Sequence, residues 1–239
     1  MSDPYGSDRV TQLPLALRYP PDQRFETFVV PSVASLMPLR ALATGQSRDW
    51  VYLAGVEGTG KTHLALAACA AAEALSRRSA FLPLASATGR LRDALVMLDG
   101  NDFIAIDGVD VVAGHADDEL ALFDFHNRAH DAGKSVLYTA SAAPDLLPLG
   151  LPDLHSRLSQ CTRISLVQLD DAGRRQVLML RARRRGLVVD DAAIDWLLKR
   201  VGRDITGLTQ LLDTLDKASL AEQRRITVPF LRKVLDHNG

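Results

Sequence analysis

Short apolar runs alternate with helix-like segments through the first two thirds of the chain. The apolar runs lie at 50–55, 79–85, 102–107 and 135–141. Between them, residues 63–78 and 119–133 have the composition and spacing of helices, and the second ends at Gly133. Apolar strands that alternate with helices are typical of a parallel sheet covered on both faces. The pattern therefore predicts an α/β fold with a parallel β-sheet in an αβα arrangement.

A different pattern begins after Leu166. Four segments carry apolar residues at helical spacing, with Asp or Thr at plausible N-cap positions: 170–186, 190–202, 205–223 and 227–238. No strand-like run separates them. We therefore expect an extended N-terminal tail over 1–20, an αβα domain over 21–166 and a small all-helical domain over 167–239.

The charge of the chain is balanced, with 28 Lys and Arg against 29 Asp and Glu and a formal net charge of −1. Without a general basic field, we expect DNA to be contacted only weakly or indirectly. No apolar stretch reaches the roughly 20 residues that span a bilayer, so we expect no membrane partner. Cys69 and Cys161 lack the spacing of a zinc site or a disulfide framework, which favours a reducing, cytoplasmic compartment.

Residues 55–62 read G-V-E-G-T-G-K-T and match the phosphate-loop pattern G-x-x-x-x-G-K-[ST]. The match lies between a predicted strand and a predicted helix, which is the required context. Glycines let backbone N–H groups turn toward phosphate oxygens, while Lys61 neutralises the terminal phosphates and the Thr62 hydroxyl ligates magnesium. The loop therefore predicts bound ADP or ATP with Mg²⁺.

A carboxylate closes the predicted strand at 103–107. Asp107 has the position that holds magnesium through water in such sites, so Thr62 and Asp107 are the candidate metal residues. The next residue is Gly108, where related ATPases usually have an acid that polarises the attacking water. Asp110 lies further along and is expected to point elsewhere. We therefore expect a nucleotide-binding protein with weak ATPase activity of its own.

The phosphate loop, the strand ending in Asp107, the polar strand end at 139–141 and the C-terminal helices together resemble the AAA+ ATPases. More specifically, four stretches are similar to the DnaA branch: RFETFVV (24–30), GTGKTHL (58–64), LPDLHSRL (151–158) and LLKRVGRDITGLTQLLDTLD (197–216). The resemblance covers residues 9–238 and implies an AAA+ fold with a helical lid domain. DnaA proteins continue into a helix-turn-helix domain, whereas this sequence ends at Gly239, so we expect no DNA reader of that kind.

The N-terminal tail carries a second resemblance. TQLPLAL (11–17) is similar to the short peptides with which bacterial proteins dock on the DNA polymerase sliding clamp. The candidate clamp-binding residues are Gln12, whose amide both donates and accepts, and the apolar anchors Leu13, Leu15 and Leu17. A clamp peptide joined to a DnaA-like AAA+ body resembles the Hda family of DnaA regulatory inactivators.

The Hda resemblance implies a regulator of chromosome replication initiation that acts near the nucleoid. The tail would dock on the beta subunit clamp loaded on DNA, and Arg157, which matches the family's arginine finger, would promote hydrolysis of DnaA-bound ATP. The initiator would pass to its inactive ADP form. A surface ion pair with Asp153 is the competing interpretation of Arg157. A helicase-loader-like, DNA-dependent AAA+ ATPase and a clamp-tethered adaptor stay open as alternatives, and so does a homo-oligomer.

Two further features follow from the comparison with the family. Its sensor II arginine aligns with Thr206, and Arg203 is the candidate replacement; the alternative is a lid that does not sense the γ-phosphate. The run of arginines at 181 and 183–185 is expected to form a solvated helix face, and a contact with an acidic partner surface or with DNA threaded through a clamp is the alternative. The full set of candidate nucleotide-binding residues is Gly55, Gly58, Thr59, Gly60, Lys61, Thr62, His63, Asp107, Thr139 and Arg203.

Overall fold

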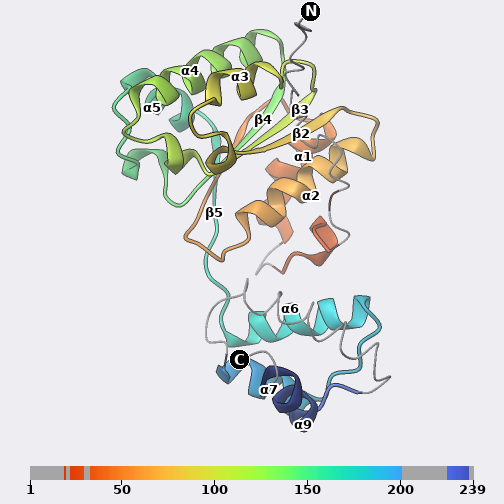
Figure 1. The fold of residues 1–239 in the computed structure, drawn as a ribbon. Coiled ribbons are helices and arrows are strands. Elements are labelled where there is room, and N and C mark those ends of the chain that lie inside the picture. The colour runs from red at the N-terminus through yellow and green to blue at the C-terminus, as the bar shows by residue number, and fades with distance from the viewer. Residues whose placement is uncertain (1–18, 20–21, 30–32, 201–224, 237–239) are drawn as a thin grey trace, which may run out of the picture.

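A five-stranded, wholly parallel sheet forms the centre of the protein, in the order β2-β3-β4-β1-β5 (Figure 1). We describe residues 19, 22–29, 33–200 and 225–236 of a computed structural model. The strands are β1 (Val51–Ala54), β2 (Ser79–Pro83), β3 (Phe103–Asp107), β4 (Ser135–Ala140) and β5 (Thr162–Ser165). Every residue of β1 and β4 is buried, as a strand covered on both faces requires. The predicted α/β fold with a parallel sheet is confirmed.

Helices cover both faces of this sheet. Helices α1 (Met37–Thr44) and α2 (Lys61–Glu73) lie on one face, and α3 (Leu91–Val96), α4 (Ala116–Asp131) and α5 (Pro152–Ser159) lie on the other (Figure 1). Short 3-10 helices connect several elements: η1 (Phe25–Thr27), η2 (Val33–Leu36), η3 (Leu84–Ala87), η4 (Val109–Val112) and η5 (Pro144–Leu146). The strand pattern had not indicated β5, because this edge strand buries only Ile164 and its other residues are polar.

A second hydrophobic cluster belongs to the C-terminal helices α6 (Asp171–Arg184), α7 (Asp191–Arg200) and α9 (Val228–Asp236). Leu178, Ile194 and Leu231 are among its buried residues. The α6 helix starts at a true cap, since the Asp170 carboxylate accepts from the amide of Gly173 at 2.8 Å. The predicted helix at 205–223 lies outside the described residues.

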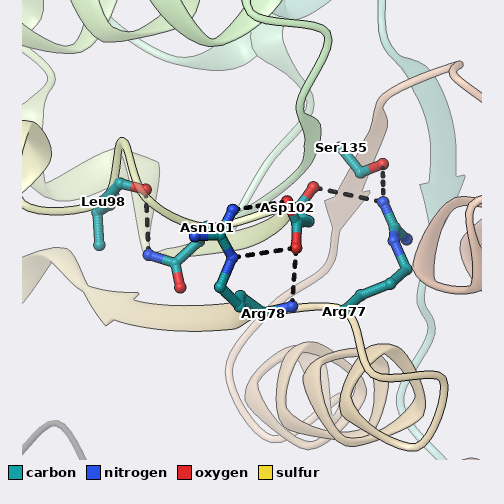
Figure 2. A network of polar contacts seen from close by, with 6 residues as sticks. All are labelled: Arg77, Arg78, Leu98, Asn101, Asp102 and Ser135. Carbon is teal, nitrogen blue, oxygen red and sulfur yellow. Dashed lines mark hydrogen bonds and ion pairs between the residues drawn. The ribbon is translucent and has the colours of Figure 1, made fainter.

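Arg77 joins α1 to the amino-terminal ends of the strands. Its Nη1 donates to the carbonyl oxygens of Leu42 at 2.9 Å and Ala43 at 2.5 Å in the last turn of α1. Its Nη2 donates to Ser135 Oγ at 2.8 Å and to the Asp102 carbonyl at 3.3 Å (Figure 2). This network lies at the amino-terminal ends of the strands, and the phosphate loop lies at their carboxyl ends.

No helix within the described ranges has both the length and the apolar character of a membrane span.

Candidate functional site

The phosphate-loop pattern forms the turn between β1 and α2. The strand ends at Ala54 and the helix begins at Lys61, so residues 55–60 make the loop. Lys61 folds back over it, and its Nζ donates to the carbonyl oxygens of Gly55 at 2.6 Å and Val56 at 3.1 Å. The ammonium group therefore lies at the N-terminal end of α2, where the helix dipole also favours an anion.

Three glycines give this loop its shape. Gly58 and Gly60 have φ angles of +78° and +91°, a region that L side chains rarely adopt. A Cβ at Gly60 would also lie 2.4 Å from Cε2 of Phe28, whose ring covers the loop. Glycine is required at 55 for steric reasons, since a Cβ there would lie 2.7 Å from the Thr59 hydroxyl. Larger residues at 55 or 60 would displace Thr59, Phe28 or the loop itself.

Asp107, Thr62 and Thr139 form one hydrogen-bonded group at the carboxyl ends of the strands. Thr62 Oγ1 donates to Asp107 Oδ2 at 2.8 Å, and Thr139 Oγ1 donates to Asp107 Oδ1 at 2.6 Å. The sheet sets this arrangement, because β4 lies between β1 and β3 with Thr139 directly opposite Asp107. The two predicted metal residues and a third polar residue therefore converge.

The oxygen atoms of Thr62 and Asp107 suit Mg²⁺. Magnesium prefers hard oxygen donors, and it usually combines one or two protein ligands with substrate phosphates and water. Both side chains line the same cleft as the phosphate loop. They would hold the ion beside a bound nucleotide, where it would neutralise phosphate charge.

Gly108 takes a left-handed conformation, with φ of +85°. The nearest atom to a Cβ there would be Val111 Cγ2 at 3.9 Å, so conformation and not space favours glycine. Asp110 lines the cleft, but its Oδ1 accepts from the backbone amide of Ser141 at 2.7 Å. Its carboxylate thus holds the turn after β4, and no acid directly follows Asp107.

These groups face a cleft of about 810 Å³. The segment 23–29 forms one wall, and the connection at 165–169 together with α6 forms another. The lining away from the phosphate loop includes Gln23, Thr27, Phe28, Val29, Leu166, Val167, Leu169, Val177 and Arg181. A polar floor with amides and Lys61 suits phosphates, and the more apolar walls suit a base.

His63 ties the segment 24–28 to α2. Its Nε2 lies 2.9 Å from the carbonyl oxygen of Arg24, and its ring centroid lies 5.2 Å from that of Phe28. Burial lowers the pKa of His63 to about 4, and the charge of Arg181 also lowers it. With Nε2 protonated, the neutral ring donates to the Arg24 carbonyl. His63 therefore supports the cleft wall that Phe28 and Thr27 form.

Arg157 lies on α5 and does not line the cleft of its own chain. Leu154 and Leu158 bury one side of α5, and Arg157 is half-buried beside them. Across the residues that the structure describes, its guanidinium has no hydrogen bond or ion pair, and the competing pair with Asp153 is not formed. Its positive charge contributes, after burial, to lowering the pKa of His126 to about 4.

The prediction of a solvated arginine face was wrong for two of its four members. Arg183 and Arg184 are exposed, whereas Arg181 lines the cleft. Arg185 forms an ion pair with Asp22 at 2.7 Å, with side chains only 18% and 21% exposed. Helical spacing explains the difference, because residues four apart share a face and Arg181 follows Val177, which also lines the cleft.

Some sequence-predicted site residues lie outside the described residues. They are the clamp-binding candidates Gln12, Leu13, Leu15 and Leu17 and the lid arginine Arg203. Conversely, the sequence had not indicated that Phe28, Arg181 or Asp22 forms or braces the walls of the cleft. Residues 25–29 are far from the phosphate loop in the sequence and approach it only in the folded protein, so their pattern did not predict a cleft wall.

The fold resembles several solved AAA+ structures. Domain III of the Thermotoga maritima replication initiation protein DnaA matches with a TM-score of 0.76 and 20% identity, over 94% of this chain and 98% of that one. AMPPCP-bound DnaA from Aquifex aeolicus matches with a TM-score of 0.67 and 19% identity, over 84% and 67%. The Thermotoga maritima RuvB Holliday junction branch migration motor matches with a TM-score of 0.62 and 17% identity, over 86% and 69%.

The C-terminal helices add a sequence-level match. Residues 171–235 match the family described as Hda, lid domain. This segment begins at the first residue of α6 and extends into α9. Residues 171–235 therefore resemble the lid of the Hda family, and the fold of the chain is of the kind seen in DnaA domain III.

Proposed function

We propose that this protein regulates replication initiation by promoting hydrolysis of ATP bound to DnaA. The Hda lid and the DnaA-like fold support a DnaA-related replication regulator. One observation carries the finer proposal: Arg157 is a cation without a partner in the described part of the chain, and it lies outside its own nucleotide cleft. An arginine in that position is better placed to bind a phosphate held by another molecule than a phosphate in its own cleft.

The chain's own cleft has a supporting role in this proposal. It would hold ADP or ATP with Mg²⁺, through the phosphate loop and through Thr62 and Asp107. Because Gly108 supplies no acid to polarise water, the bound nucleotide stabilises the structure more than it is consumed. The reaction then takes place on DnaA, to which Arg157 adds charge that stabilises phosphoryl transfer.

The tail completes the proposal as a tether. Gln12 and the leucines at 13, 15 and 17 would bind the sliding clamp, which concentrates the chain where newly replicated DNA lies. Tethering raises the encounter rate, whereas Arg157 raises the rate of the chemical step. The two contributions are therefore separable by experiment.

The test is single-turnover hydrolysis of labelled ATP preloaded on DnaA, with this protein, ADP and clamp loaded on DNA. We expect the wild type to accelerate hydrolysis and Arg157→Ala to lose about 10³-fold or more of the acceleration, the range of arginine fingers. Arg163→Ala is the matched control, since Arg163 is an exposed arginine on the adjacent β5. Gln12→Ala should lower the acceleration in reactions that contain the DNA-loaded clamp and have no effect in reactions without it.

Two results of this experiment would favour a different function. If the wild type leaves DnaA-bound ATP unchanged but turns over its own ATP when single-stranded DNA is added, the protein is the helicase-loader-like ATPase. If Arg157→Ala is silent while Gln12→Ala abolishes the effect, it is a clamp-tethered adaptor.

A further inference from the structure

A buried carboxylate lies behind the helix that carries Arg157. Glu119, in the first turn of α4, is 1% exposed. No other carboxylate among the described residues is buried to this extent. Burial of a charge is costly unless hydrogen bonds compensate for it, so its surroundings show what it holds.

Three backbone amides donate to Glu119. Its Oε1 accepts from Gly114 at 2.8 Å and from Gly150 at 3.0 Å, and its Oε2 accepts from Leu151 at 2.7 Å. Gly114 lies just before α4, so the first contact is local. Gly150 and Leu151 are 31 and 32 residues away and directly precede α5. One carboxylate therefore joins the starts of α4 and α5.

The position of this contact explains how the charge is tolerated. Leu151 is the N-cap of α5, and Gly114 adjoins the N-cap of α4 at His115. Helix N-termini carry partial positive charge and free N–H groups, which favour an anion. A neutral amide at 119 would lose this attraction, and its NH₂ group would face an N–H donor.

The α5 helix depends on this anchor because it is short. It has eight residues, and its buried side chains are Leu154 and Leu158. Arg157 lies six residues beyond Leu151, roughly 9 Å along the helix axis at 1.5 Å per residue. A tilt of about 10° at the anchored end would move the Arg157 backbone by roughly 1.5 Å. Errors of about 1 Å in a catalytic group can cost about a hundredfold in rate.

We propose that Glu119 is the positioning residue for Arg157: its carboxylate fixes the start of α5 and thereby sets where the arginine is presented. This inference rests on the proposed function, in which Arg157 acts on ATP bound to DnaA. It adds a residue that touches no nucleotide and lies on a different helix from the arginine. The role is distinct from a contribution to the cleft, which Glu119 does not line.

The test uses the full chain with Glu119→Gln, and Asp117→Asn as the matched control in the same turn of α4. Asp117 is exposed, so its loss should leave the rate unchanged. We expect Glu119→Gln to lower the maximal single-turnover rate at saturating protein by between about tenfold and a hundredfold. The concentration for half-maximal effect and the chain's own affinity for ADP should stay as in the wild type.

Three further readouts separate positioning from a general loss of structure. In the Arg157→Ala background, Glu119→Gln should cause no further loss, because both changes remove the same contribution. Hydrogen exchange of the chain alone should speed up at the amides of Gly150, Leu151 and α5 and stay unchanged in β1 and β4. Glu119→Asp, which keeps the charge on a shorter side chain, should recover part of the rate.

The outcomes distinguish the two proposals. If the wild type accelerates hydrolysis through Arg157 and Glu119→Gln matches it, the positioning role alone is overturned. The same follows if the losses of the two variants add, or if Glu119→Gln weakens ADP binding. If the wild type gives no acceleration at all, the proposed function is overturned, and the positioning role falls with it.

Discussion

The ion pair between Asp22 and Arg185 should control how tightly the cleft holds its nucleotide. The pair joins the two walls of the cleft: Asp22 precedes Gln23 in the N-terminal wall, and Arg185 directly follows α6, which carries Arg181. The carbonyl of Asp22 also accepts from the Thr27 hydroxyl at 2.6 Å, so the carboxylate extends from a fixed backbone. Breaking the pair should let the walls separate.

The magnitude follows from the burial of the pair. Exposed ion pairs contribute up to about 1 kcal/mol, and hydrogen bonds to charged groups about 1.5–3 kcal/mol. With N and O 2.7 Å apart and side chains 18% and 21% exposed, the pair lies between these cases. We take about 1–2 kcal/mol, which corresponds to a loss of about 5- to 30-fold in nucleotide affinity if the pair forms only in the bound arrangement.

The assay is the dissociation constant of a fluorescent ADP analogue for Asp22→Asn, Arg185→Gln and the double variant. Each single change should weaken binding, and the double variant should be no weaker than the singles, because both remove one interaction. Arg184→Gln, an exposed neighbour, should bind as the wild type does. Unchanged affinity in Asp22→Asn, or losses that add in the double variant, would show that the ion pair does not hold the cleft walls together.

Three other perturbations have definite expected results. Gly60→Ala should abolish ADP binding, measured by calorimetry, because its Cβ would lie 2.4 Å from the Phe28 ring at a φ of +91°; Gly89→Ala, at a left-handed glycine with open space around it that does not line the cleft, should still bind. Arg77→Ala should lower the free energy of unfolding in urea by about 2 kcal/mol, since the Ala43 carbonyl oxygen and Ser135 Oγ lose the charged donor that Arg77 supplies; retention of wild-type stability would contradict this. His63 and His126 have pKa values lowered from 6.5 to about 4, so the unfolded chain binds more protons between these values and stability must fall as pH drops from 6.5 to 4. The expected slope is about 1.4 kcal/mol per pH unit for each histidine, and His126→Gln should reduce it.

The phosphate loop was predictable because its chemistry is local. Gly60, Lys61 and Thr62 act within one turn, and the strand and helix around them have clear patterns of their own. Asp107 was also predictable, since a carboxylate that ends an apolar strand has few other uses. The group that Asp107 forms with Thr139 was less so, because it depends on the strand order that places β4 between β1 and β3.

The remaining features depend on contacts between distant segments. Phe28 covers the loop only because His63 holds the preceding segment against α2. Arg181 and Glu119 carry charges that, from sequence, indicate a solvated face, yet one lines the cleft and the other is buried beneath two helix N-termini. The environment of these two side chains is set by the tertiary fold, so it could not be predicted from the residues next to them in the sequence.

In the proposed function, Arg157 acts on a nucleotide that another molecule holds. The most direct measurement loads DnaA with ATP carrying one label and this protein with ATP carrying another, and follows both phosphates in a single turnover. We expect fast release of the DnaA label, slow release of the other, and loss of only the fast release in Arg157→Ala. Fast release of this protein's own label, with the DnaA label unchanged, would show that Arg157 does not act on DnaA-bound ATP.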